Sequence, residues 1–308
     1  MRKLLLLPVL ALAACNTPSE APPALKASAG EIQSPTQPDH YLVGIENEHL
    51  PRLIQVSASI YSGAQPKTAE SFHALKELGI KTVVSVDAAR PDLEAAQAEG
   101  LRYIHIPIGY DSIPEAAGDA YAKVMAEAEL PIYFHCHHGR QRGPAAAAVA
   151  LRASTGCAAK SALAVLHAAG TSSKYPGLWR DVEAWTSPRP GKPSPELVSL
   201  QELPAFTMKM AEVDRTWDRI KEVRKNDWES VSLVPDTQLL LQQLQDCAGQ
   251  IPAEQMDDQR LFHGMEDVVS FAQRMQQAAE VLDKDLLEES YSDLRVSCND
   301  CHADYRNQ

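Results

Sequence analysis

The hydrophobic and polar positions follow different patterns in the two halves of the chain. In the first half, β-branched and aromatic runs occupy residues 82–86, 103–108 and 132–135, which is typical of buried strands. Helical stretches lie between these runs, for example at residues 68–78. Strands that alternate with helices predict an α/β fold with a mostly parallel sheet flanked by helices.

In the second half the apolar residues recur at steps of three and four. One series runs from Phe206 to Ile220 and another from Leu261 to Leu282, and each is the core face of an amphipathic helix. Residues 235–247 and 286–305 add two more helical segments. This half is therefore predicted to be an all-α, antiparallel four-helix bundle.

Two proline-rich stretches divide the chain. Residues 15–40 hold several prolines among Ser and Ala, a composition typical of a flexible tether. Residues 187–202 hold four more prolines, Pro188, Pro190, Pro193 and Pro195. We therefore predict an α/β domain at 41–186, a linker at 187–202 and a helical domain at 203–308.

The first residues have the features of an export signal. Two basic residues and a short apolar stretch lead to Leu12-Ala13-Ala14-Cys15, which resembles a bacterial lipobox. The resemblance implies that residues 1–14 are a signal peptide, that Cys15 carries lipid, and that Asn16 favours the outer membrane. An ordinary cleaved signal with an incidental Cys15 is the alternative. We expect a lipid-anchored protein in the bacterial periplasm.

Charge and cysteine content narrow the function further. The 308 residues have a formal net charge of -12, and an acidic surface repels a phosphate backbone, so nucleic acid is not an expected partner. No later segment is apolar enough to cross a bilayer, so lipid on Cys15 is the expected membrane contact. Six cysteines are too few for a disulfide scaffold, so each is interpreted individually.

One cysteine lies in a loop suited to binding an oxyanion. Cys136 follows a buried strand, Arg142 follows it by six positions, and Gly143-Pro144 open an alanine-rich helix. A strand-to-helix loop directs backbone N–H groups inward, and the helix N-terminus adds positive potential. Such surroundings lower a thiol pKa, while an Arg can donate two N–H groups to a phosphate.

These residues resemble the signature of the Cys-based protein phosphatases, His-Cys-x5-Arg. The segments 60–66 and 78–84 resemble the opening of the dual-specificity branch. The resemblance covers about residues 40–186 and implies that Cys136 attacks phosphorus while Arg142 and the loop bind the phosphate. The other loop residues are His135, His137, His138, Gly139, Arg140 and Gln141.

The resemblance also implies a general acid upstream of the cysteine. We predict Asp111, which ends the second strand; Asp119 is the second choice, and a turn or N-cap role is the alternative for Asp111. The family usually has Ser or Thr directly after the loop Arg, but this chain has Gly143. Slow breakdown of the phosphoenzyme, or a non-hydrolytic role, therefore stays open.

Metal binding and sulfur chemistry are two alternatives for this loop. Consecutive residues rarely converge on one ion, so we expect His137 and His138 to tune substrate preference and expect no metal besides haem iron. Rhodaneses also present a Cys in such a loop, which leaves sulfur chemistry at Cys136 as a third hypothesis. The five-residue spacing to Arg142 favours phosphate.

A second motif, Cys298-Asn299-Asp300-Cys301-His302, lies near the end of the sequence. Two thiols spaced in this way on a helix can add to the haem vinyl groups, and His302 can then bind the iron. A thioredoxin-like motif would need a preceding strand, and a zinc site would need a fourth ligand. We therefore predict one covalently attached haem c.

The motif on the last of four helices resembles cytochrome c prime over about residues 200–308. In that family the first helix lines the distal side of the haem. Met210 on that helix has two interpretations, a sixth ligand to the iron or a core side chain. Cys157 and Cys247 are expected to be buried thiols. The resemblance leaves a homodimer open.

Together the motifs predict an exported haem-c lipoprotein with a Cys-dependent phosphomonoesterase domain that is controlled by haem redox state or gas binding. The alternative is an electron-transfer or gas-binding cytochrome whose phosphatase-like domain is an inactive anion-binding module. The expected partners are a phosphorylated substrate of unknown identity, and a periplasmic redox partner or a small gas.

Overall fold

The structure is a computed structural model that describes residues 42–188, 195–252, 255 and 257–306. The predictions for the signal peptide, the tether and lipidation of Cys15 lie outside the described residues. Among those residues, no helix is both long and apolar enough to span a membrane.

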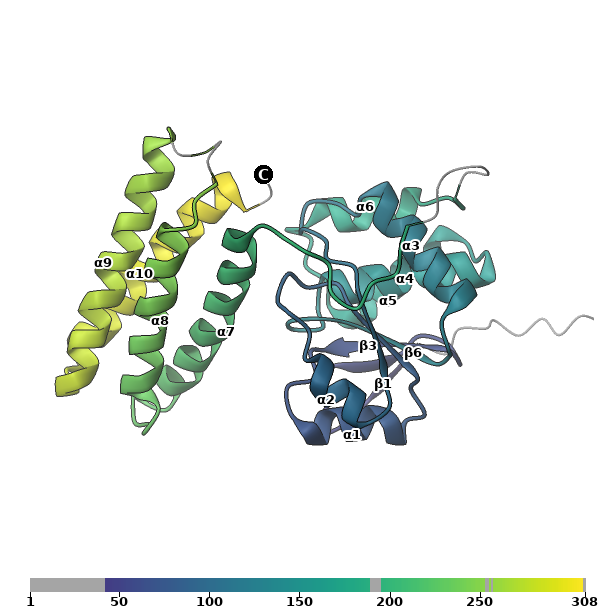
Figure 1. The fold of residues 1–308 in the computed structure, drawn as a ribbon, viewed down its shortest axis with the longest axis horizontal. Helices are drawn as coiled ribbons and strands as arrows, with labels where there is room; N and C mark the ends of the chain where they lie inside the picture. Colours follow the sequence, from purple (N-terminus) through teal and green to yellow (C-terminus); the bar gives the residue numbers. More distant parts are fainter. Residues whose placement is uncertain (1–41, 189–194, 253–254, 256, 307–308) are drawn as a thin grey trace, which may run out of the picture. The chain divides into compact units, whose positions relative to one another are not determined.

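A six-stranded sheet is the centre of the first half (Figure 1). The strand order is β1-β2-β3-β6-β4-β5. The first two pairs are antiparallel and the three pairs among β3, β6, β4 and β5 are parallel, which confirms the predicted α/β fold with its mostly parallel sheet. The strands are β1 Val43–Ile45, β2 Leu53–Gln55, β3 Ile60–Ala64, β4 Thr82–Ser85, β5 Arg102–His105 and β6 Ile132–Cys136.

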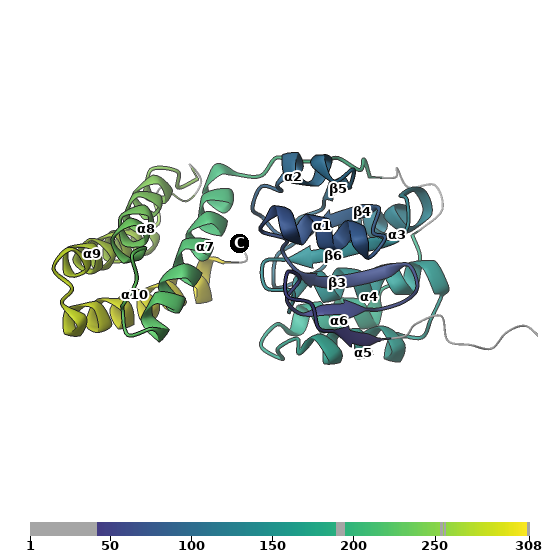
Figure 2. The ribbon, with the colours of Figure 1, turned by 90° about the horizontal axis from the view of Figure 1, so that it is seen from below.

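Helices cover both faces of this sheet (Figure 2). Val83 and Tyr133 belong to the apolar cluster on the side of α1 and α2, while Val84 and Phe134 belong to the cluster formed with α3 to α6. Because both faces are buried, the central strands are continuous apolar runs rather than alternating ones. The helices are α1 Ala69–Glu77, α2 Leu93–Ala98, α3 Glu115–Glu127, α4 Arg142–Thr155, α5 Ala159–Ala169 and α6 Pro176–Ala184.

Four long helices make up the second half, which confirms the predicted helical region. Helices that are consecutive in the chain pack against each other around a single cluster that contains Ile220, Leu261 and Met275. Asp258 and Asp283 accept hydrogen bonds as N-caps of the last two helices. The helices are α7 Ala205–Lys225, α8 Leu233–Ala248, α9 Gln259–Val281 and α10 Lys284–Tyr305.

Part of the predicted linker contacts the sheet edge. The backbone N–H of His105 in β5 donates to the carbonyl of Val198 at 2.9 Å, and Gln201 N–H donates to Nδ1 of His105 at 3.2 Å. These bonds satisfy polar groups that an uncovered edge strand would leave free. The predicted domain limits, 41–186 and 203–308, stay a prediction.

Candidate active site

The candidate site lies where parallel strands end. β6 ends at Cys136 and α4 begins at Arg142, while Asp87 follows β4 and Tyr110 follows β5. Because β4, β5 and β6 are parallel, their carboxyl ends lie at the same edge of the sheet. The structure thus brings together two predicted residues, Cys136 and Arg142, and two that sequence reasoning missed, Asp87 and Tyr110.

Arg142 is held by side chains that follow the ends of β4 and β5. It is 6% exposed, and its Nη2 donates to Asp87 Oδ2 at 2.8 Å and to Tyr110 OH at 2.9 Å. Burial disfavours the charged guanidinium, but Asp87, Tyr110 and Cys136 outweigh it and raise the pKa of Arg142. The side chain therefore stays cationic next to Cys136, which is itself 4% exposed.

One donor of Arg142 has no acceptor. Its Nε is buried and has no hydrogen-bond partner among the residues that the structure describes. A buried donor left unsatisfied costs about 1–3 kcal/mol. An oxyanion bound beside Cys136 would supply the missing acceptor.

Asp87 connects the loop between β6 and α4 to two arginines. Besides Arg142, its carboxylate accepts the backbone N–H of His137 at 2.9 Å and lies 3.5 Å from Nη2 of Arg215 in α7. Burial opposes ionisation of Asp87, but the charges of Arg142 and Arg215 prevail and hold its pKa well below the ordinary value. The sequence offered one indication of this role, because Asp87 is an acidic residue directly after a predicted buried strand. Its partner Arg142, however, is far away in the sequence.

Gly139 permits the loop to pass close to β3. Its φ is +66°, and a Cβ at this position would lie 2.3 Å from backbone atoms of Gly63 and Ala64. Only glycine meets both the positive φ and the close approach. The shape of the loop therefore depends on this residue.

Gly139→Ala is expected to destabilise the chain by about 2–5 kcal/mol, because it combines backbone strain with a collision against backbone. Urea unfolding measures the change. Gly79→Ala is the matched control, since Gly79 has φ +80° with no atom within 4 Å of its Cβ position, so only strain of about 1–3 kcal/mol applies. Equal losses in the two variants would contradict the close approach.

Other loop residues are tied to the surrounding fold. His135 is buried, and its Nε2 lies 2.5 Å from the hydroxyl of Tyr103. Burial lowers the pKa of His135 to about 3, so it is neutral. The carbonyl of Arg140 accepts from the Thr171 hydroxyl, and the side chain of Gln141 accepts the N–H of Ser172. These contacts hold the loop from behind.

The loop histidines both reach α7. Nε2 of His137 and Nε2 of His138 each lie 2.7 Å from Oδ2 of Asp218. His137 is buried and His138 is exposed. The described residues form one unit of the fold, so α7 is part of the environment of the loop.

The predicted acid, Asp111, lies on an exposed loop. Its carboxylate accepts from the Ser112 hydroxyl at 3.4 Å, and within the described ranges it forms no hydrogen bond to Cys136 or Arg142. A Cβ on Gly177 would lie 1.4 Å from the carbonyl oxygen of Asp111, so α6 holds this loop closely. The acid role of Asp111 stays a prediction. The second choice, Asp119, lies within α3.

Tyr110, next to Asp111, lies between two arginines. The guanidinium of Arg142 is 4.1 Å from the centroid of its ring, and that of Arg306 is 4.0 Å away. Both are cation–π distances. The end of the helical region thus contacts the residue that hydrogen-bonds Arg142.

Close packing explains why this chain has a glycine at position 143, where the phosphatase family usually has Ser or Thr. A Cβ on Gly143 would lie 3.0 Å from the backbone nitrogen of Cys136 and 3.1 Å from the carbonyl carbon of His135. These contacts are tighter than ordinary ones, so glycine lets α4 approach the end of β6 closely.

The residues of the predicted haem motif lie on α10. Cys298 and Cys301 are free thiols that pack against the apolar cluster of the helical region, and burial raises the pKa of Cys298 to about 12. His302 is exposed, yet desolvation and the charge of Arg306 lower its pKa. Two free thiols and a neutral imidazole on one helix fit covalent haem in residue type.

Met210 and the remaining cysteines occupy core positions to different degrees. Met210 packs against the same cluster as the two motif thiols, which is consistent with both of its interpretations. Cys247 is buried as expected, whereas Cys157 is only half-buried because it follows the C-terminal end of α4.

No protein-family model matches the chain. A beta-lactamase hydrolase-like protein of Agrobacterium fabrum (strain C58) is 32% identical over 100 residues, which are 29% of this chain and 22% of the relative. The chain thus spans less than a quarter of that relative's length.

Several solved structures are similar to part of the chain. TpbA of P. aeruginosa has 23% identity and a TM-score of 0.41, with 47% of this chain and 91% of TpbA covered; another TpbA structure is a complex with phosphotyrosine. Human DUSP28 has 23% identity and a TM-score of 0.36, with 43% and 91% covered. The similarity to TpbA and to DUSP28 covers less than half of this chain in each case, and the relationship of the helical half to cytochrome c prime stays a prediction.

Proposed function

We propose that the chain is a Cys-dependent phosphomonoesterase. The Cys136 thiolate attacks the phosphorus of a phosphomonoester, the bond to the leaving oxygen breaks, and that oxygen takes a proton from Asp111. Water then attacks the thiophosphate and gives a proton to the Asp111 carboxylate, the P–S bond breaks, and inorganic phosphate, the thiolate and protonated Asp111 result. The observation that carries the proposal is the buried Arg142, whose Nε–H has no acceptor among the residues that the structure describes.

The surrounding groups suit this chemistry. Helix α4 begins at Arg142. Its N-terminus adds positive potential near the equatorial oxygens of the transferred phosphoryl group, where negative charge develops. Asp87 fixes one end of the guanidinium through Nη2, which leaves Nε for the phosphoryl group. A planar guanidinium held in this way donates with fixed geometry.

The test is hydrolysis of an aryl phosphate by the full chain, followed from the first turnover onward. Continuous release of the phenol supports the proposal. A burst that equals the protein concentration supports attack by Cys136 with slow breakdown of the intermediate, as expected from Gly143. Without even a burst the proposal fails, and a phosphatase-like domain that binds anions without turnover is the better description.

We further propose that Cys298 and Cys301 attach one haem c and that His302 binds its iron. When bound, this group would supply electron transfer or gas binding. Met210 in α7 would be a second protein ligand to the iron. The support is the residue set on α10 together with the predicted export, because bacterial haem attachment takes place outside the cytoplasm.

Replacing both Cys298 and Cys301 with Ser is expected to abolish covalent haem, because each thioether needs a thiol. Denaturing mass spectrometry and the absorbance of the unfolded chain measure the bound haem after expression with a haem-attachment system. A Cys157→Ser and Cys247→Ser double variant is the control and should keep the haem. The attachment would be refuted if the wild type and both double variants had the same haem content, or if none of them contained haem.

A contact connects the proposed haem site with the proposed phosphate site. Arg306 follows His302 by four residues and stacks on Tyr110, which hydrogen-bonds Arg142. We propose that haem redox state or a bound gas alters phosphate binding through this stack. Equal turnover in the ferric, ferrous and nitric oxide-bound forms would refute the coupling.

The proposal for location rests on the N-terminal sequence. Lipid on Cys15 would anchor the protein in the periplasm, to the outer membrane, and the substrate would be a phosphorylated molecule of that compartment. Labelling with a radioactive fatty acid, compared with a Cys15→Ser variant, tests the anchor.

A further inference from the structure

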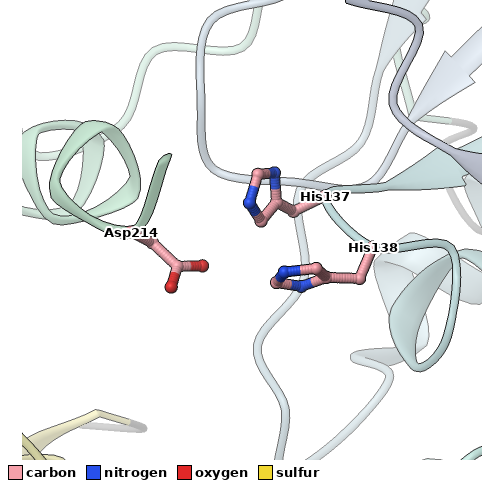
Figure 3. A group of neighbouring side chains, drawn as sticks. All are labelled: His137, His138 and Asp214. Carbon is pink, nitrogen blue, oxygen red and sulfur yellow. The ribbon is translucent and has the colours of Figure 1, made fainter. Parts of the chain in front are cut away.

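Three potential metal ligands meet beside the phosphate loop (Figure 3). His137 and His138 come from the loop and Asp214 comes from α7, and one ligand atom of each lies within 4.8 Å of the others. The centroids of the two imidazole rings are 4.1 Å apart and the ring planes make an angle of 67°. Adjacent residues rarely converge on one ion, but here the ring orientation and a distant third residue bring suitable ligand atoms together.

A fourth residue fixes the orientation of both rings. Oδ2 of Asp218 lies 2.7 Å from Nε2 of His137 and 2.7 Å from Nε2 of His138. The other carboxylate oxygen of Asp218, Oδ1, accepts from Nζ of Lys221 at 2.8 Å. These contacts hold both imidazole rings against α7.

One of the histidines has a nitrogen without a partner. His137 is 2% exposed, and its Nδ1 is buried with no hydrogen-bond partner in the described part of the chain. Buried polar nitrogens normally have a partner, so His137 keeps an unused hydrogen-bonding group inside the fold. His138 is exposed, so solvent reaches the other side of the cluster.

We infer that His137, His138 and Asp214 form a site for a divalent transition metal ion of the zinc type. Two imidazoles and one carboxylate are ligands that Zn²⁺ accepts, and three protein ligands leave one coordination position for water or another small molecule. Asp218 is the positioning residue of the site. The assignment does not depend on phosphatase activity.

The location gives the ion a structural effect. His137 directly follows Cys136, while Asp214 belongs to α7. An ion bound by both would join α7 to the phosphate loop. It would also place positive charge beside the position where a substrate phosphate is proposed to bind.

The test is calorimetric titration of the full chain with Zn²⁺ alone. The background carries Cys136→Ser, Cys298→Ser and Cys301→Ser, because these thiols would otherwise bind zinc themselves. We expect one tight site whose affinity falls by more than about 100-fold with Asp214→Asn or His138→Ala, and by about 10–100-fold with Asp218→Asn. Circular dichroism identifies any variant that fails to fold.

The test has a control variant at a surface histidine and a second measurement, the absorption spectrum of bound Co²⁺. His73 lies 3.6 Å from Glu77 and 3.4 Å from Glu99, so His73→Ala removes an exposed histidine with carboxylate neighbours and should leave the affinity unchanged. Co²⁺ bound to the background protein should show a d–d spectrum without thiolate charge-transfer bands. No tight site, equal weakening by His73→Ala, or unchanged affinity in Asp214→Asn would overturn the assignment.

Discussion

Replacing Cys136 with serine is expected to lower kcat for an aryl phosphate by about 10⁴-fold or more, a loss of at least about 5.5 kcal/mol in transition-state stabilisation. A serine hydroxyl is not ionised near neutral pH, and His135 is a weak base because burial lowers its pKa to about 3 and its Nε2 contacts the Tyr103 hydroxyl. Steady-state hydrolysis and the burst amplitude measure the effect.

The structure supplies a control for this result. Cys157 is half-buried and lies beyond the far end of α4, so Cys157→Ser should keep wild-type kcat. The Cys136→Ser protein should still bind inorganic phosphate, because Arg142 and the loop are unchanged. Residual turnover above a tenth of the wild-type rate would assign the activity to another group.

Asp87→Asn is expected to have the second largest effect, with a loss of about 3–5 kcal/mol in the free energy of unfolding, because it leaves the charge of Arg142 buried without its partner. The variant should also lower kcat/KM, since an unheld guanidinium no longer fixes the phosphoryl oxygens. Urea unfolding and aryl phosphate hydrolysis measure the two effects. Asp92→Asn is the control, because Asp92 is an exposed N-cap of α2 and should cost about 0.5–2 kcal/mol at most.

The ion pair of Asp87 and Arg142 also predicts how the free energy of unfolding depends on pH. The pKa of Asp87 is lower in the folded chain than in the unfolded chain, where it is about 3.9. The ion pair therefore contributes its full stability above about pH 4 and loses it as the pH falls toward the folded pKa. The stability difference between wild type and Asp87→Asn should be constant near neutral pH and shrink below about pH 4. A difference that stays constant down to pH 2 would show that the ion pair is not its source.

Local patterns in the sequence determined the layers of the fold. The apolar run at 82–86 and the steps of three and four from Leu261 to Leu282 depend only on neighbouring residues, so they predicted a buried strand and a long helix. The spacing of Cys136 and Arg142 is likewise local, because one loop and one helix turn connect them. The same holds for Cys298 and Cys301, which lie on one helix.

Only the tertiary structure decided which other residues surround Cys136. Asp87 and Tyr110 reach the loop because β4 lies beside β6 and β5 lies beside β4 in the sheet, an order that the sequence pattern does not specify. Asp214 and Asp218 reach the loop histidines because α7 packs there. On an isolated amphipathic helix they are ordinary polar-face residues. Contacts between segments this far apart depend on how the elements pack, and periodicity within each element carries no information about that.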